Sequence, residues 1–161
     1  MVDFHELYTR YAADVHRFAL FLSGDRALAD DITSETFLRA WSASAPIREA
    51  TVKGYLFTIA RNVFLHELRG VRKRDELPEE LPSPAASPAE RAESRSSLGA
   101  VLEALRTLPE LDRSALLFRA EDEMSYEEIG RALGLSAGAA RVRVHRARMK
   151  LLTLIPNEAL P

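Results

Sequence analysis

The sequence predicts an all-α protein built from two small helical domains joined by a flexible linker, the second of which contains a helix-turn-helix. Three observations predict this fold class. Apolar residues recur at steps of three and four along most of the chain. Neither an alternating β-branched run nor an Asn-Gly or Asp-Gly hairpin signal is present. Four prolines gather between residues 75 and 97, where the missing amide proton of proline opposes a helix.

The first domain, residues 1–74, is expected to hold three helices, at about 3–23, 26–41 and 52–74. Gly24 ends the first, because glycine enters the left-handed conformation without a steric penalty. Each helix carries an apolar stripe, and we expect Phe57 and Trp41 to lie in the core.

The linker, residues 75–97, has four acidic residues among its first six, Asp75, Glu76, Glu79 and Glu80, directly after a basic run at 69–74. Its composition fits a plain tether, and it equally fits an electrostatic shield for the basic run.

The second domain, residues 98–161, begins with two apolar stripes and then shows the signals of a helix-turn-helix. Ser125 and Glu128 have the spacing of a capping box. Gly134 stops that helix, and Ser136 caps the next one. The last helix carries Arg141, Arg143, Arg146, Arg148 and Lys150 and no acidic residue. A solvated basic face would have the same composition, but caps, turn and arginines in this order favour a DNA-reading helix.

Composition limits the classes of function. The net charge is −2 and the pI about 6.1, so we expect DNA binding to need a larger partner. Cysteine is absent, which suits a reducing cytoplasm. No signal peptide or membrane span is evident. The four histidines lack ligand spacing, and no catalytic residues, metal site or cofactor are predicted.

Four stretches, at 30–41, 55–62, 108–113 and 125–130, resemble in order the conserved segments of bacterial sigma factors. The two-domain length is similar to the extracytoplasmic-function (ECF) group, and the resemblance covers nearly the whole chain except the linker. It implies a subunit that binds core RNA polymerase and directs promoter-specific initiation by reading −35 duplex and −10 single-stranded DNA. The alternative is a free-standing helix-turn-helix regulator that does not dock on polymerase.

The resemblance also implies site residues. Asp31, Glu35 and Leu38 share a helix face that suits a partner with a basic rim and an apolar centre. The implied polymerase-binding set is Asp30, Asp31, Ser34, Glu35 and Leu38. The implied −10 set is Tyr55, Arg61, Asn62, Leu65, His66 and Arg69, with Tyr55 open between base stacking and core packing. The implied −35 set is Ser136, Ala139, Ala140, Arg141, Arg143, His145, Arg146 and Arg148.

The last helix departs from the family at one place that bears on its DNA preference. Ala139 replaces a common threonine, which removes a phosphate-contacting hydroxyl; Ala139 and Ala140 offer methyl groups to a thymine instead. His145 fits either a phosphate contact or plain exposure. Members of the family are usually held by an anti-sigma factor, so such a partner is expected here as well.

Overall fold

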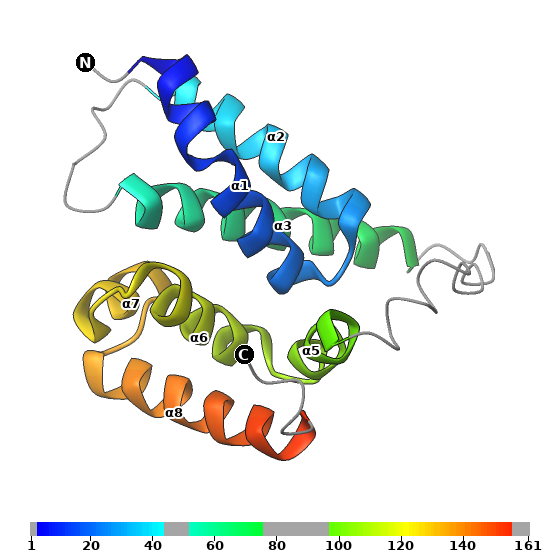
Figure 1. The fold of residues 1–161 in the computed structure, drawn as a ribbon, viewed down its shortest axis with the longest axis vertical. Helices are drawn as coiled ribbons and strands as arrows, with labels where there is room; N and C mark the ends of the chain where they lie inside the picture. Colours follow the sequence, from blue (N-terminus) through cyan, green and yellow to red (C-terminus); the bar gives the residue numbers. More distant parts are fainter. Residues whose placement is uncertain (1–2, 44–51, 76–96, 156–161) are drawn as a thin grey trace.

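The computed structural model describes residues 3–43, 52–75 and 97–155, and within these ranges all regular secondary structure is helical (Figure 1). The helices are α1 (Phe4–Ser23), α2 (Arg26–Ser42), α3 (Val52–Asp75), α5 (Ser97–Arg106), α6 (Glu110–Asp122), α7 (Tyr126–Leu133) and α8 (Ala137–Leu154). The all-α fold class is confirmed, and each predicted helix is present within a few residues of its expected ends. Residues 76–96 of the predicted linker and the segment 44–51 lie outside the described residues, whereas Asp75 and Ser97, the two ends of that linker, are the last residue of α3 and the first of α5.

The helices begin and end where the local sequence indicates. The Asp3 carboxylate accepts a hydrogen bond from the backbone N–H of His5, and Asp25 caps α2 by accepting one from Leu28. Gly24 ends α1 with φ 69°, and its N–H donates to the carbonyl of Leu20. These local bonds satisfy backbone groups that a helix terminus leaves open.

Helices α1, α2 and α3 pack together as the N-terminal half (Figure 1). Their contact faces are apolar and fully buried, with Phe18, Leu22, Ile32 and Leu56 at the centre. Phe57 is also fully buried, as expected. Trp41, predicted to be in the core, is instead 67% exposed. That prediction was wrong because Trp41 stands near the end of α2, where the ring of Phe4 lies 5.6 Å away between centroids and leaves most of the indole exposed.

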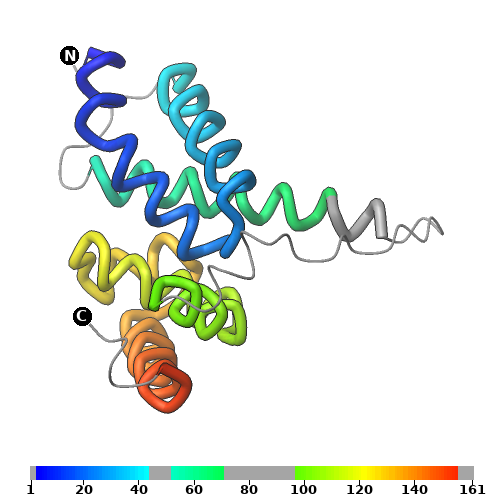
Figure 2. Tube along the Cα trace, turned by 45° about the vertical axis from the view of Figure 1, so that its right-hand side comes forward, coloured from blue at the N-terminus to red at the C-terminus, as the bar shows by residue number. Residues whose placement is uncertain are grey.

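Helices α6, α7 and α8 form the body of the C-terminal half, and α5 lies beside α1 and α8. In this half the most extensive helix pairing is that of α6 with α8, and α7 packs against both helices. Ile129 of α7 and Val144 of α8 meet there in a buried apolar layer. This layer fixes α8 on the outer side of the half (Figure 2).

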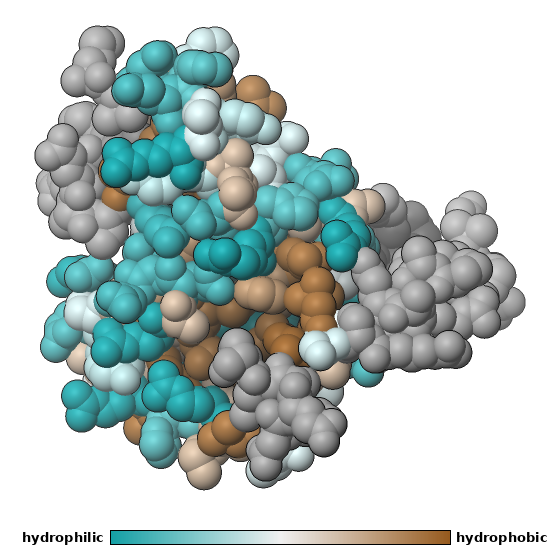
Figure 3. Space-filling model, viewed as in Figure 1, coloured by the Kyte–Doolittle hydropathy of each residue, from teal (hydrophilic) through white to brown (hydrophobic). Residues whose placement is uncertain are grey.

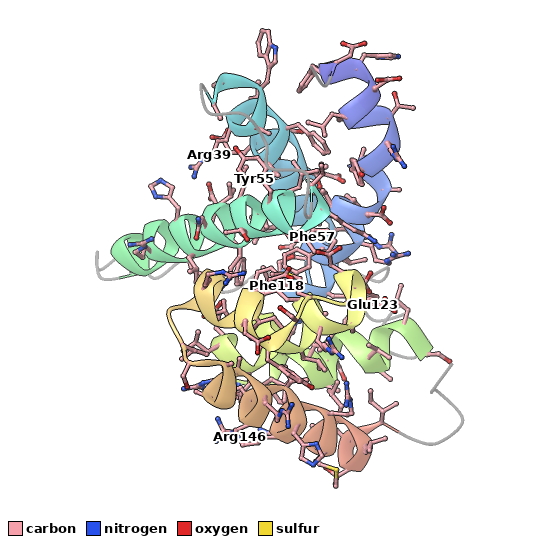
Figure 4. The ribbon with its side chains drawn as sticks, turned by 90° about the vertical axis from the view of Figure 1, so that its left-hand side faces the viewer. Arg39, Tyr55, Phe57, Phe118, Glu123 and Arg146 are labelled. Carbon is pink, nitrogen blue, oxygen red and sulfur yellow. The ribbon has the colours of Figure 1, made fainter. Side chains whose placement is uncertain are left out.

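The two halves contact each other directly through α1 and α3 on one side and α5 and α6 on the other. The Phe18 ring stacks on Phe57 at 4.3 Å and on Phe118 of α6 at 5.6 Å between centroids. Figure 4 shows Phe57 and Phe118 at this junction. On the face drawn in Figure 3, hydrophobic side chains gather where the end of α1 meets α5. The buried apolar core therefore runs from one half into the other.

Candidate functional site

The helix-turn-helix forms with the caps that the sequence predicts. The hydroxyl of Ser125 accepts a hydrogen bond from the N–H of Glu128 at 3.1 Å, and the same hydroxyl donates to the Glu128 carboxylate at 3.2 Å. Gly134 closes α7 with φ 72°. The hydroxyl of Ser136 accepts from the N–H of Ala139 at 3.1 Å and starts α8. The turn is therefore defined by its own sequence as well as by packing.

Gly130 holds the turn close to α7. The N–H of Leu135 donates to the carbonyl of Gly130 at 2.8 Å. A Cβ at position 130 would lie 2.4 Å from the carbonyl oxygen of Leu135, a backbone atom that has little room to move. Only glycine permits this approach, so Gly130 sets the angle at which α8 leaves the turn.

One face of α8 is buried against α6 and α7. Ala140, Val144 and Ala147 lie on it with 1% exposure or less. The prediction that Ala140 contacts a thymine methyl is therefore wrong: spaced four residues before Val144, its methyl belongs to the core. Ala139 is only half-buried, and Ser136 is exposed at the start of the helix.

The rest of the α8 surface is open and largely basic. Arg141, His145 and Arg148 are exposed there, with the apolar Val142 beside them. The guanidinium of Arg141 lies over the Tyr126 ring at 5.0 Å, and Arg119 lies over the same ring at the same distance. These cation–π contacts hold Arg141 at the edge of the open face.

Two other predicted DNA contacts, Arg143 and Arg146, are bonded to α6, although the Arg146 side chain remains 58% exposed. Arg143 donates to the Asp112 carboxylate at 2.8 Å, and Arg146 donates to both of its oxygens at 3.1 Å. Burial alone would raise the pKa of Asp112. Hydrogen bonds and charge from the two arginines outweigh it and hold that pKa below its ordinary value of 3.8. The arginines and Asp112 thus form a built cluster.

The predicted −10 residues on α3 divide into three groups. Asn62, His66 and Arg69 are exposed. Tyr55 and Leu65 are half-buried and pack against the core, which favours a packing role for much of each side chain. The Arg61 side chain is only 12% exposed, because it donates to both carboxylate oxygens of Glu110 at 2.7 and 3.0 Å and to Ser114 at 3.2 Å. Arg61 is therefore engaged across the junction between the halves.

Further bonds cross the same junction. Arg17 of α1 donates to the Glu121 carboxylate at 2.9 Å. Arg113 and Arg106 donate to the carbonyls that end α1, those of Leu22 and Gly24. Sequence reasoning missed Glu110 and Asp112, since acidic residues in the first turn of a helix also suit its dipole without any partner.

The α2 residues predicted to dock on polymerase lie at the surface to different degrees. Asp31, Ser34 and Leu38 are exposed on one side of the helix. Glu35 is half-buried and pairs with Arg39 at 3.1 Å, while Asp30 accepts from the His16 ring at 2.8 Å. The exposed Trp41 extends this face by one turn, a residue that its apolar character had assigned to the core.

Among the residues that the structure describes, no group of three or more histidine or acidic side chains is placed to hold a metal ion. In the same ranges, no helix is both long and apolar enough to cross a membrane.

Comparison with known families matches both halves. The model for sigma-70 region 2 matches residues 7–74, and the model for sigma-70 region 4 matches residues 98–151. The ECF sigma factor SigM of Bacillus subtilis is 30% identical over 154 residues, which cover 92% of this chain and 93% of SigM. The chain belongs to the ECF sigma factors. Such proteins are promoter-directing factors of RNA polymerase, and the free-standing regulator is not favoured.

Other relatives of this sigma factor agree. SigE of Mycolicibacterium smegmatis is 38% identical over 156 residues; the match covers 94% of this chain and 61% of SigE. Among solved structures, the sigma factor RpoE in complex with the anti-sigma factor NepR, from Bartonella quintana, has a TM-score of 0.74 and 29% identity. That match covers 94% of this chain and 96% of RpoE. CnrH in complex with the cytosolic domain of CnrY has a TM-score of 0.65 and 26% identity, over 94% of this chain and 86% of CnrH.

Proposed function

We propose that this ECF sigma factor binds core RNA polymerase through α2 and reads promoter DNA through α3 and α8. The observation that carries the proposal is the separation of charge: an acidic and apolar face on α2, and exposed polar and basic faces on α3 and α8. A regulator that reads only duplex DNA needs the basic face of α8 and has no use for the faces on α2 and α3. Residues 1–74 and 98–161 would then act as separate binding domains around the linker.

The docking surface that we propose consists of Asp30, Asp31, Ser34, Glu35 and Leu38, extended by Trp41. Exposed carboxylates together with the large apolar side chains of Leu38 and Trp41 suit a partner that is basic around an apolar patch. Trp41 has the size and exposure of an interface anchor, because a tryptophan buries a large area when a partner covers it.

The −10 surface that we propose is the exposed side of α3. Asn62 has a side-chain amide that pairs with base edges, and Arg69 supplies positive charge for the backbone. Arg61 joins this surface only after its bond to Glu110 opens, which links −10 binding to separation of the two halves.

The −35 surface that we propose is the open face of α8. Its first turns place Arg141, Val142 and His145 where a recognition helix meets base edges. Val142 offers methyl groups to thymine, and Arg148 lies further along for phosphate contact. We expect the protein to act in the cytoplasm, where the polymerase is.

An anti-sigma partner is also proposed. RpoE is bound to the anti-sigma factor NepR, and CnrH to the cytosolic domain of CnrY, in the similar structures. Because α1 and α3 contact α6, the two halves already lie together, and such a partner could bind both of them at once. No enzymatic activity is proposed.

The test is reconstitution of the chain with core RNA polymerase and transcription from candidate promoters. We expect transcripts that neither component yields alone, and weak promoter binding by the free chain. Asn62→Ala should reduce binding of a single-stranded −10 oligonucleotide while leaving −35 duplex binding unchanged. Tight, sequence-specific duplex binding by the free chain, with no gain from polymerase, would favour the regulator instead.

A further inference from the structure

Asp112 of α6 lies beside the middle of α8, within hydrogen-bond distance of two of its arginines. Its side chain is 3% exposed, and both oxygens accept hydrogen bonds, at 2.8 Å from Arg143 and at 3.1 Å from Arg146. Two cations thus share one buried carboxylate. Asp112 precedes Arg143 by 31 residues and Arg146 by 34 residues in the chain. A buried charge stays stable when paired and hydrogen-bonded in this way.

The arginines of α8 therefore form two sets that sequence alone does not separate. Arg143 and Arg146 lie three residues apart on the flank facing α6, and Lys150 continues that row with a bond to the carbonyl of Thr107. Arg141 and Arg148 lie outside the row and belong to the open face with His145. Among the residues that the structure describes, Arg141 and Arg148 can present their charge without breaking a bond to Asp112, whereas Arg143 and Arg146 must break one.

We infer that Asp112 is a specificity-determining positioning residue, which withholds Arg143 and Arg146 from DNA phosphates and leaves base reading to the open face of α8. The inference rests on the proposed −35 reading by α8. Phosphate contacts strengthen binding to any sequence, whereas base contacts discriminate between sequences. A protein that restrains two arginines of its recognition helix therefore binds DNA of any sequence more weakly, while it still discriminates between sequences through its base contacts.

The restraint has a physical basis in the cluster itself. The Asp112 carboxylate offsets one of the two positive charges, and the hydrogen bonds fix the long side chains in one geometry. Without the carboxylate charge, the arginines regain rotamer freedom and reach phosphates on either side of the groove. The gain in affinity would then be the same for all sequences.

The test compares Asp112→Asn with the wild type in complex with core polymerase, by fluorescence anisotropy on a −35 duplex and a scrambled duplex over a series of salt concentrations. Asparagine keeps the shape of the side chain and removes its charge. We expect tighter binding to the scrambled duplex and a smaller ratio of the affinity for the −35 duplex to that for the scrambled duplex. The slope of log affinity against log salt concentration should become steeper by about 0.9 to 1.8. Glu103→Gln, at an exposed position of α5, is the control with the same charge change.

A second pair of variants keeps the inference testable if Asp112→Asn unfolds, which thermal melting would reveal. Arg146 is 58% exposed, and Arg148 is also exposed, so both tolerate glutamine. Arg148→Gln should make the salt dependence of the affinity shallower by about 0.9 in log–log slope, and Arg146→Gln should leave that slope nearly unchanged. Equal losses for both, or a uniform drop on both duplexes for Asp112→Asn at constant slope, would overturn the inference. No −35 preference in the wild-type complex would instead overturn the proposed function.

Discussion

The bond between Arg61 and Glu110 is the sharpest test of how the two halves are held. The Glu110 carboxylate accepts two hydrogen bonds from Arg61, at 2.7 and 3.0 Å, and the two side chains are 12% and 25% exposed. A charge-assisted bond of this kind contributes about 1.5–3 kcal/mol, and desolvation offsets part of it. Glu110→Gln should therefore weaken the packing of the halves by about 1–2 kcal/mol, which shifts the ratio of packed to separated forms by about 5–30-fold.

Fluorescence transfer between the halves measures that shift. The chain has no cysteine, so Thr9→Cys on α1 and Thr153→Cys on α8 give two label sites, both exposed. Wild type should show one short distance that lengthens when core polymerase is added. Glu110→Gln should show a longer or broader distribution before polymerase is added, and tighter binding of a −10 oligonucleotide by the free chain. Glu103→Gln is the matched control. An unchanged distribution for Glu110→Gln would refute the role of this bond.

Three further predictions concern other parts of the molecule. Asp31→Lys combined with Trp41→Ala should weaken association with core polymerase in a titration without lowering the melting temperature, because both side chains are exposed; unchanged affinity would remove this face from the docking surface. Gly130→Ala should lower the stability of the C-terminal half by about 1–3 kcal/mol in denaturant unfolding, since its Cβ meets the carbonyl of Leu135; an unchanged midpoint would show that the turn relaxes. Burial raises the pKa of Asp122 above 3.8, so its stabilising contribution is full below that pH and is lost as pH rises through the higher value; Asp122→Asn should raise the melting temperature at pH 7, and no rise would contradict the reading.

Local signals in the sequence predicted most of the fold. Ser125, Gly134 and Ser136 act on backbone groups within a few residues, so their spacing alone places the turn and both helices. Periodicity also identified the buried sides of α1 and α3, but not that of α8, where the buried Ala140 was assigned to DNA. It did not tell which end of a helix extends past its neighbours, and Trp41 was misplaced for that reason.

The candidate site was predicted less fully, because its key contacts are distant in sequence. Arg143 and Arg148 look alike on the chain, yet only Arg143 meets Asp112. Arg61 was expected to be open to DNA, and its partner Glu110 lies 49 residues away. Composition identifies a basic helix, but tertiary packing decides which of its charges remain available.

The aromatic stack of Phe18, Phe57 and Phe118 has a thermal consequence. Any separation of the halves exposes these rings to water, and exposure of apolar surface raises the heat capacity. Apolar contacts also weaken on cooling, whereas the bond between Arg61 and Glu110 does not depend on the same term. The balance between packed and separated halves should therefore vary with temperature in a curve rather than a line, and cold should favour separation.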